Sequence, residues 1–151
     1  MLIEISRTDS GVSVLQVFRG DPAEALAKWE SRGRYMAVSW REITEAEVPV
    51  DHWFREAWEP GQGGPIKINM AKAREIQARH IQAAREREVV VLQGKEGIAH
   101  LTGRAADASQ HAADRATLET MNLTAVAVSI AGATNPTALK AVWPAKLLPQ
   151  E

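Results

Sequence analysis

The sequence contains no cysteine and carries almost no net charge. The absence of cysteine excludes disulfide frameworks, zinc–thiolate sites and thiol catalysis, and it is typical of proteins made in a reducing cytosol. Eighteen Lys and Arg stand against nineteen Asp and Glu, so no overall field favours nucleic acid or anionic lipid. The first residues show no signal-peptide pattern, and no segment approaches the roughly 20 apolar residues of a membrane span. We therefore expect a soluble, unprocessed protein that binds neither nucleic acid nor a membrane.

Aromatic residues are few, but most of them are tryptophans. The chain has one tyrosine, two phenylalanines and five tryptophans. The large amphipathic indole ring serves either in a core or as an anchor at an interface, and we expect a core position for about three of the five. The tryptophans are Trp29, Trp40, Trp53, Trp58 and Trp143.

Residues 1–45 predict a small ββαβ unit. Alternating apolar residues on both sides of the Gly-containing turn at 9–11 are typical of a β-hairpin. Asp21 followed by Pro22 is typical of a helix start, because Asp caps free backbone N–H groups and proline needs no hydrogen bond in the first turn. Alternation over 35–41 then predicts a third strand.

Residues 46–69 predict a connector that carries tryptophan. A short helix is expected over 51–58, where Phe54 and Trp58 are four residues apart and would share one face. The Gly-rich loop at 61–65 should end that helix. The loop lacks the Lys-Ser/Thr of a phosphate-binding loop, so we interpret it as a flexible turn between two elements.

Residues 70–130 predict a helical hairpin. The stretch 70–92 contains good helix formers without Pro or Gly. Three glycines within 94–103 predict a turn region, and a second helical stretch follows over 105–130. The β-branched residues within 126–130 could instead form a strand.

Residues 131–151 predict a short C-terminal helix and a tail. Thr134 or Asn135 is the candidate cap, Pro136 suits the first helical position, and Pro144 should end the helix. The expected fold class is therefore α+β: a small N-terminal ββαβ unit, a Trp-bearing connector and a helical C-terminal half built on a hairpin.

The sequence offers no recognisable catalytic or metal-binding pattern. No serine lies in a nucleophile motif, and no carboxylate pair has a recognisable catalytic frame. The histidines lack the spacing that places two imidazoles on one helix face. We expect no metal, no cofactor and no enzymatic activity. The four histidines are His52, His80, His100 and His111.

What remains is interaction surface. The helix over 70–92 has a narrow apolar face, which indicates packing along one seam against a partner helix or its own copies. A homo-oligomer is therefore expected. Large aromatic residues beside the Gly-rich loop and near the C-terminus are the other candidate anchors. The candidate partner-binding residues are Trp53, Phe54, Trp58, Ile76, His80 and Trp143.

Three stretches resemble a group of small proteins encoded beside tail genes in phages and prophages, especially those of proteobacteria. They are VSWREI at 38–43, the run from DHWFREAW to INMAKAREIQARHIQAARE at 51–86, and NPTALKAVWP at 135–144. The segment 89–130 departs from this group, in which a longer charged helical hairpin is expected. The layout and the closing Trp-Pro are also similar to those of phage tail fibre assembly proteins.

The resemblance implies a non-enzymatic structural component of a phage tail, at the tail tip, fibre or fibre-attachment region. Its expected partners are other tail or fibre proteins, and a trimer would match the threefold symmetry common in tail fibres. The expected location is the virion tail, after synthesis in the host cytoplasm. The alternative is an assembly chaperone that is not retained in the virion. A tail-borne cell-wall hydrolase is a third hypothesis, which the absence of a catalytic motif disfavours.

Overall fold

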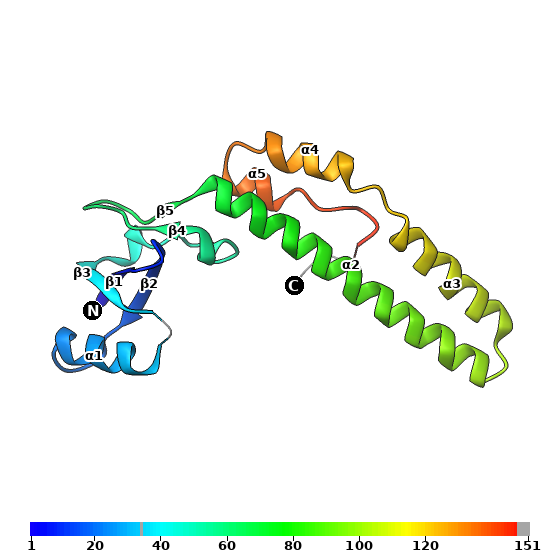
Figure 1. Ribbon diagram of the computed structural model, residues 1–151, viewed down its shortest axis with the longest axis horizontal. Helices are drawn as coiled ribbons and strands as arrows, with labels where there is room; N and C mark the ends of the chain where they lie inside the picture. Colours follow the sequence, from blue (N-terminus) through cyan, green and yellow to red (C-terminus); the bar gives the residue numbers. More distant parts are fainter. Residues whose placement is uncertain (34, 148–151) are drawn as a thin grey trace. The chain divides into compact units, whose positions relative to one another are not determined.

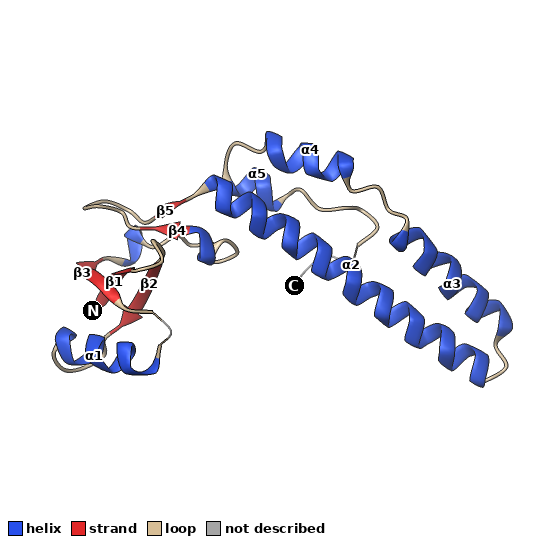
Figure 2. Ribbon diagram, viewed as in Figure 1, coloured by secondary structure: helices blue, strands red, loops and turns tan. Residues whose placement is uncertain are grey.

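The computed structural model describes residues 1–33 and 35–147, and the fold is α+β. The chain divides into two compact units, Met1–Ala73 and Arg74–Glu151. Strands occur in the first unit, and the second is built from helices (Figures 1 and 2). The elements of the first unit are β1 (Leu2–Arg7), β2 (Val12–Gln16), α1 (Pro22–Arg32), β3 (Ala37–Ile43), the 3-10 helices η1 (Glu45–Glu47) and η2 (Arg55–Ala57), β4 (Trp58–Glu59) and β5 (Lys67–Ile68).

The predicted ββαβ unit is confirmed. Its three strands form an antiparallel sheet in the order β2-β1-β3. The hairpin turn contains Ser10 in the left-handed region at φ 62°. The Asp21 carboxylate accepts a hydrogen bond from the Ala23 N–H at 2.9 Å, so the predicted start of α1 is confirmed as well. The third strand begins at Ala37, two residues later than predicted.

The sheet of the first unit is covered on both faces. On one face Ile3, Ile5 and Val17 form a buried cluster against α1, with Leu15 of β2 beside them. On the other face a second cluster joins β2 and β3 to the connector. Its buried members are Val12, Ile43, Trp58 and Ile66. Strand β1 is therefore central, while β2 and β3 are the two edges of the sheet.

The predicted helix over 51–58 is wrong over most of its length, because 51–54 is not helical and Trp58 lies in a strand. Only the 3-10 turn η2 forms, and Trp58 begins strand β4, where it pairs with Ile68 of β5. The four-residue spacing of Phe54 and Trp58 fits a helix, but a two-stranded ribbon lets Trp58 reach the cluster on the sheet. The predicted turn at 61–65 connects these two strands.

The predicted helical hairpin is confirmed in the second unit. Helices α2 (Met70–Leu101) and α3 (Ala105–Glu119) pack side by side (Figure 1). The Arg115 Nε lies 3.2 Å from a carboxylate oxygen of Glu96. The Arg85 Nε donates to the Leu118 carbonyl at 2.8 Å, near the end of α3. These contacts fix how the two helices align.

The predicted turn region within 94–103 is wrong in its first part. Helix α2 continues through Gly94 and Gly97 and ends before Gly103, which has a φ of +70°. A glycine inside a helix costs only about 1 kcal/mol relative to alanine. The buried contacts of Leu92 and Ala99 on the same helix can offset that cost.

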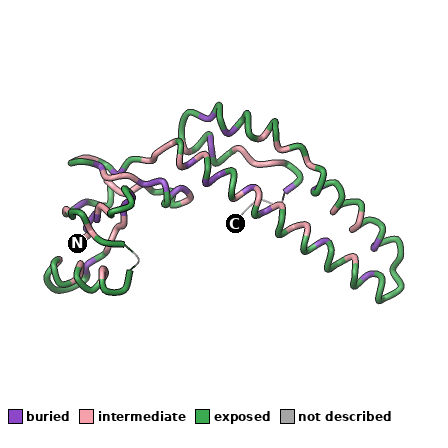
Figure 3. Tube along the Cα trace, viewed as in Figure 1, coloured by how far each residue is buried: buried purple, intermediate pink, exposed green. Residues whose placement is uncertain are grey.

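The segment that could have contained a strand is helical. Helix α3 stops at Glu119, and α4 (Thr124–Gly132) follows after a short break. Only Ile130 of α4 is buried, and Figure 3 shows most of this helix exposed.

The predicted C-terminal helix forms as α5 (Pro136–Lys140), with the Asn135 side chain accepting from the Ala138 N–H at 2.8 Å. It ends earlier than the predicted stop at Pro144. The end of the predicted tail, 148–151, lies outside the described residues.

Candidate protein-binding site

A polar network fixes the connector to the sheet of the first unit. Glu4 on the central strand is only 2 % exposed, and its carboxylate lies 2.7 Å from the guanidinium of Arg41 on β3. Arg41 also lies 2.7 Å from the Glu47 carboxylate and donates to the Gly64 carbonyl at 2.5 Å. A buried carboxylate needs such partners, because an unpaired charge away from water is costly.

The network shifts the proton affinities of its members. Hydrogen bonds to Glu4 and then to Glu47 raise the pKa of Arg41. The Thr44 backbone N–H and then Arg41 hold the pKa of the Glu47 carboxyl below its ordinary value. Arg41 and Glu47 therefore stay charged near neutral pH, and their ion pair holds the connector to the sheet.

The Gly-rich turn is part of this network. The Gly61 N–H donates to the Glu4 carboxylate at 3.3 Å. A Cβ on Gly61 would lie 2.0 Å from the Gly64 carbonyl oxygen, so the turn closes only with glycine at that position. Sequence reasoning interpreted this loop as a flexible link, whereas the structure gives it a defined conformation with fixed hydrogen bonds.

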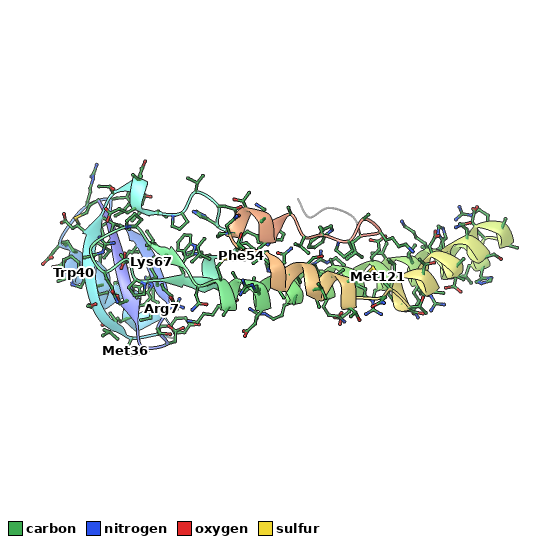
Figure 4. All side chains as sticks on the ribbon, turned by 90° about the horizontal axis from the view of Figure 1, so that it is seen from above. Arg7, Met36, Trp40, Phe54, Lys67 and Met121 are labelled. Carbon is green, nitrogen blue, oxygen red and sulfur yellow. The ribbon has the colours of Figure 1, made fainter. Side chains whose placement is uncertain are left out.

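Strand β3 and the residue before it carry exposed apolar side chains. Met36 is 59 % exposed, Val38 68 % and Trp40 41 %. Figure 4 labels Met36 and Trp40 at the periphery of the first unit. We call Met36, Val38 and Trp40 the β3 row. Val38 and Trp40 lie on the edge strand β3, and Met36 comes just before it. A register shift opposite Ser6 and Arg7 interrupts the strict alternation. Three large exposed apolar residues this close in sequence form an uncommon surface for a single chain.

Three of the six predicted partner-binding residues are buried, which corrects their assignment as surface anchors. Phe54 is 1 % exposed, Trp58 2 % and Ile76 4 %. Trp58 belongs to the cluster on the sheet, where its ring meets His52 edge-on at 5.3 Å between centroids. Side chains this deeply buried cannot contact another protein unless the fold opens.

The other three predicted residues are half-buried. Trp53 lies in the first unit, and its backbone N–H donates to the Asp51 carboxylate at 2.9 Å. His80 and Trp143 lie in the second unit. The structure therefore does not bring the six predicted residues together in one site.

The narrow apolar face of α2 is filled by its own chain. Ile81 and Leu92 are buried along it, and the fully buried Gln77 donates to the Val142 carbonyl at 2.8 Å. Arg74 donates to the Ala133 carbonyl at 2.9 Å. The sequence pattern indicated a seam for a partner helix, and the C-terminal segments of the same chain occupy much of it. The expected homo-oligomer stays a prediction, and the buried part of this face would not serve it.

The described residues were compared with the requirements of a metal site and of a membrane-crossing helix. No group of three His, Asp or Glu side chains within 1–33 and 35–147 could hold a metal ion. In the same residues, no helix combines the length and apolar character needed to cross a membrane. Comparison with known proteins gave no matching family model, no matching curated protein and no matching solved structure.

Sequence reasoning missed the β3 row. The alternation over 35–41 predicts a strand, but it does not say which set of residues the rest of the chain covers. In the structure Ala37 packs against the cluster on the α1 side and Ile43 belongs to the cluster on the connector side, whereas Val38 and Trp40 stay exposed. The available signal was that this strand alternates large apolar residues with small or charged ones, as a strand with two unlike faces does.

Proposed function

We propose that this chain is a non-enzymatic structural component of a phage tail that acts through protein–protein contacts. The observation that carries the proposal is the β3 row. Its three apolar side chains are exposed to water at one edge of the sheet. A protein partner that buried them would remove this apolar surface from water, which is favourable. The near-neutral net charge agrees with a protein partner rather than a polyanion.

The assignment to a tail rests on the resemblance of 38–43, 51–86 and 135–144 to proteins encoded beside tail genes. The first of these stretches contains Val38 and Trp40, two of the three members of the row. Its partners would then be other tail or fibre proteins at the tail tip, fibre or fibre-attachment region. A trimer remains an expectation from the symmetry of tail fibres.

The proposal is tested by quantitative mass spectrometry of gradient-purified phage particles beside the crude lysate. A structural component appears in a fixed ratio to the other tail proteins. The variant Val38→Glu should reduce incorporation, because it places a charge in the row. The matched control is Val90→Glu on α2, where valine has nearly the same exposure (66 % against 68 %). Equal incorporation of both variants into particles would count against the β3 row as the partner-binding surface.

The alternative is an assembly chaperone that leaves before the particle is complete. One observation favours it: the run 120–139 contains no charged residue, although a quarter of the chain is charged. Helix α4 lies in this run, and Val128 is 67 % exposed. Such a face suits transient contact with an unfinished client. Abundance in the lysate together with absence from particles would favour this alternative.

A further inference from the structure

Strand β2 is an open edge of the sheet. Met1 and Val17 exchange main-chain hydrogen bonds at 2.9 and 3.3 Å, which fixes the alternation of the β1–β2 ladder. Because ladder groups alternate in direction, the N–H and C=O groups of Val14 and Gln16 turn away from β1 toward the open side. The strand contains no charged residue and no proline, so it lacks the usual devices that prevent strand addition.

A hollow lies beside this edge on each face of the sheet. The hollow on the connector side has a volume of about 370 Å³, and Val14 and Trp58 form part of its wall. The hollow on the α1 side has a volume of about 420 Å³ and lies between Leu15 and Trp29. Consecutive residues of a strand point to opposite faces. An added strand would therefore place two neighbouring side chains in the two hollows.

The walls of the hollows indicate the chemistry of those side chains. Lys28 and Arg32 border the α1-side hollow, and no acidic residue lines it. At the connector-side hollow, Arg55 and His52 can donate hydrogen bonds, and Glu45 also borders it. An occupant with an acidic residue near the first hollow would meet cations there, and an acceptor oxygen in the second would meet the donors of Arg55 and His52.

We propose that β2 is a strand-addition site for an extended segment of a partner protein, which pairs antiparallel to β2. The segment carries a side chain with an acceptor oxygen for the connector-side hollow and, next in sequence, an apolar side chain for the α1-side hollow. The segment also carries acidic residues two positions before and two positions after the apolar one, and these lie near Lys28 and Arg32. Main-chain hydrogen bonds supply affinity, and the two hollows supply specificity.

The charges favour a different protein over a second copy of this chain. Edge-to-edge pairing of two β2 strands uses a twofold axis perpendicular to the sheet, which puts both α1 helices on the same face. Lys28 and Arg32 of one copy would then approach the same residues of the other. Like charges at such a junction oppose pairing.

The test uses the full chain and the synthetic peptide Thr-Glu-Gln-Val-Thr-Glu-Thr, with binding measured by calorimetry. In the proposed pairing, the backbone N–H groups of the Gln and of the second Thr of the peptide point to β2. Those of the Val and of the second Glu point away from it. Methylating the first pair of nitrogens should weaken binding at least about tenfold, because two hydrogen bonds are lost. Methylating the second pair should change it little. No binding, or equal effects of the two methylations, would overturn the proposal.

A charge exchange provides a second test, which separates a lost ion pair from a misfolded variant. The double variant Lys28→Glu, Arg32→Glu should bind the peptide roughly five- to tenfold more weakly, as expected for exposed ion pairs. Replacing both Glu residues of the peptide by Lys should restore binding to the variant. Failure of this rescue, with the variant folded by circular dichroism, would refute the placement of the segment beside α1.

This inference deepens the proposed function and rests on it, since it names the kind of segment that a tail partner would contribute. The two can fail separately. A chain that is present in particles but does not bind the peptide keeps the proposed function and loses the strand-addition site. A chain that binds the peptide but is absent from particles keeps the site and loses the structural role.

Discussion

At the scale of single residues, Arg41 is the cation that compensates the buried Glu4. Replacing it by methionine leaves that carboxylate without its partner, and removing one member of a buried pair typically costs 3–5 kcal/mol. Arg41 is 28 % exposed, so solvent screening reduces the expected loss to about 2–4 kcal/mol. Urea denaturation of Arg41→Met measures it. Arg104→Met, which removes an exposed pair with Asp107, should cost no more than about 1 kcal/mol. Equal losses would contradict a special role for Arg41.

Glu47 makes the stability of the first unit depend on acid. The pKa of its carboxyl is lowered in the folded chain from an ordinary value of 4.5, chiefly by the Thr44 N–H and then by Arg41. A lowered folded pKa contributes stability that is present above the unfolded pKa and is lost as the pH falls through the folded value. We expect the melting temperature of the wild type to fall below about pH 4.5 more steeply than that of Glu47→Gln.

The measurement for this prediction is thermal unfolding by circular dichroism between pH 7 and pH 3. The control is Glu75→Gln, because Glu75 is exposed on α2. That variant should follow the wild type across the whole range. A constant difference between wild type and Glu47→Gln at every pH would show that the carboxylate's charge is not what stabilises the network.

At the scale of elements, the glycines of α2 are sites where the helix can be strengthened. A Cβ on Gly94 or Gly97 would meet no atom within 4 Å, so alanine fits at both positions. Each substitution should stabilise the helix by about 0.5–1 kcal/mol, because alanine loses less backbone entropy on folding. Gly103→Ala should destabilise it, since Gly103 has a φ of +70°. Thermal unfolding at 222 nm compares the three, and a destabilising Gly94→Ala would contradict an open α2 surface there.

The elements also show which features a sequence can predict. The cap at Asp21 was predicted correctly, and Asn135 was one of the two candidates for the last helix, because capping depends on a few neighbouring residues. The end of α2 was misplaced, because its continuation through Gly94 depends on packing along the rest of the helix. Trp58 was placed on a helix rather than a strand for a related reason, since its partner Ile68 lies beyond the Gly-rich turn.

At the scale of the whole molecule, the fold class was predictable and the site was not. Periodicity predicts the order of strands and helices, and hence the α+β class. Whether Ile76 or Val38 meets solvent depends on which segments cover each face, and that is decided by contacts distant in sequence. Sequence reasoning therefore chose the residues with the largest apolar rings, and the fold buries two of these, Phe54 and Trp58.

The two units lead to a prediction about autonomous folding. Both buried clusters of the first unit consist of residues within 1–73, so the fragment 1–73 should fold alone. Domains of about 55–65 residues can do so, although their stability is marginal. A dispersed amide spectrum and cooperative thermal unfolding would confirm it. Trp58→Ala in the fragment should abolish folding, because truncating a buried Trp costs about 3–5 kcal/mol. The folded fragment should also bind the strand peptide as the full chain does, since β2 and both hollows lie within it. A disordered fragment would mean that the sheet depends on residues after Ala73.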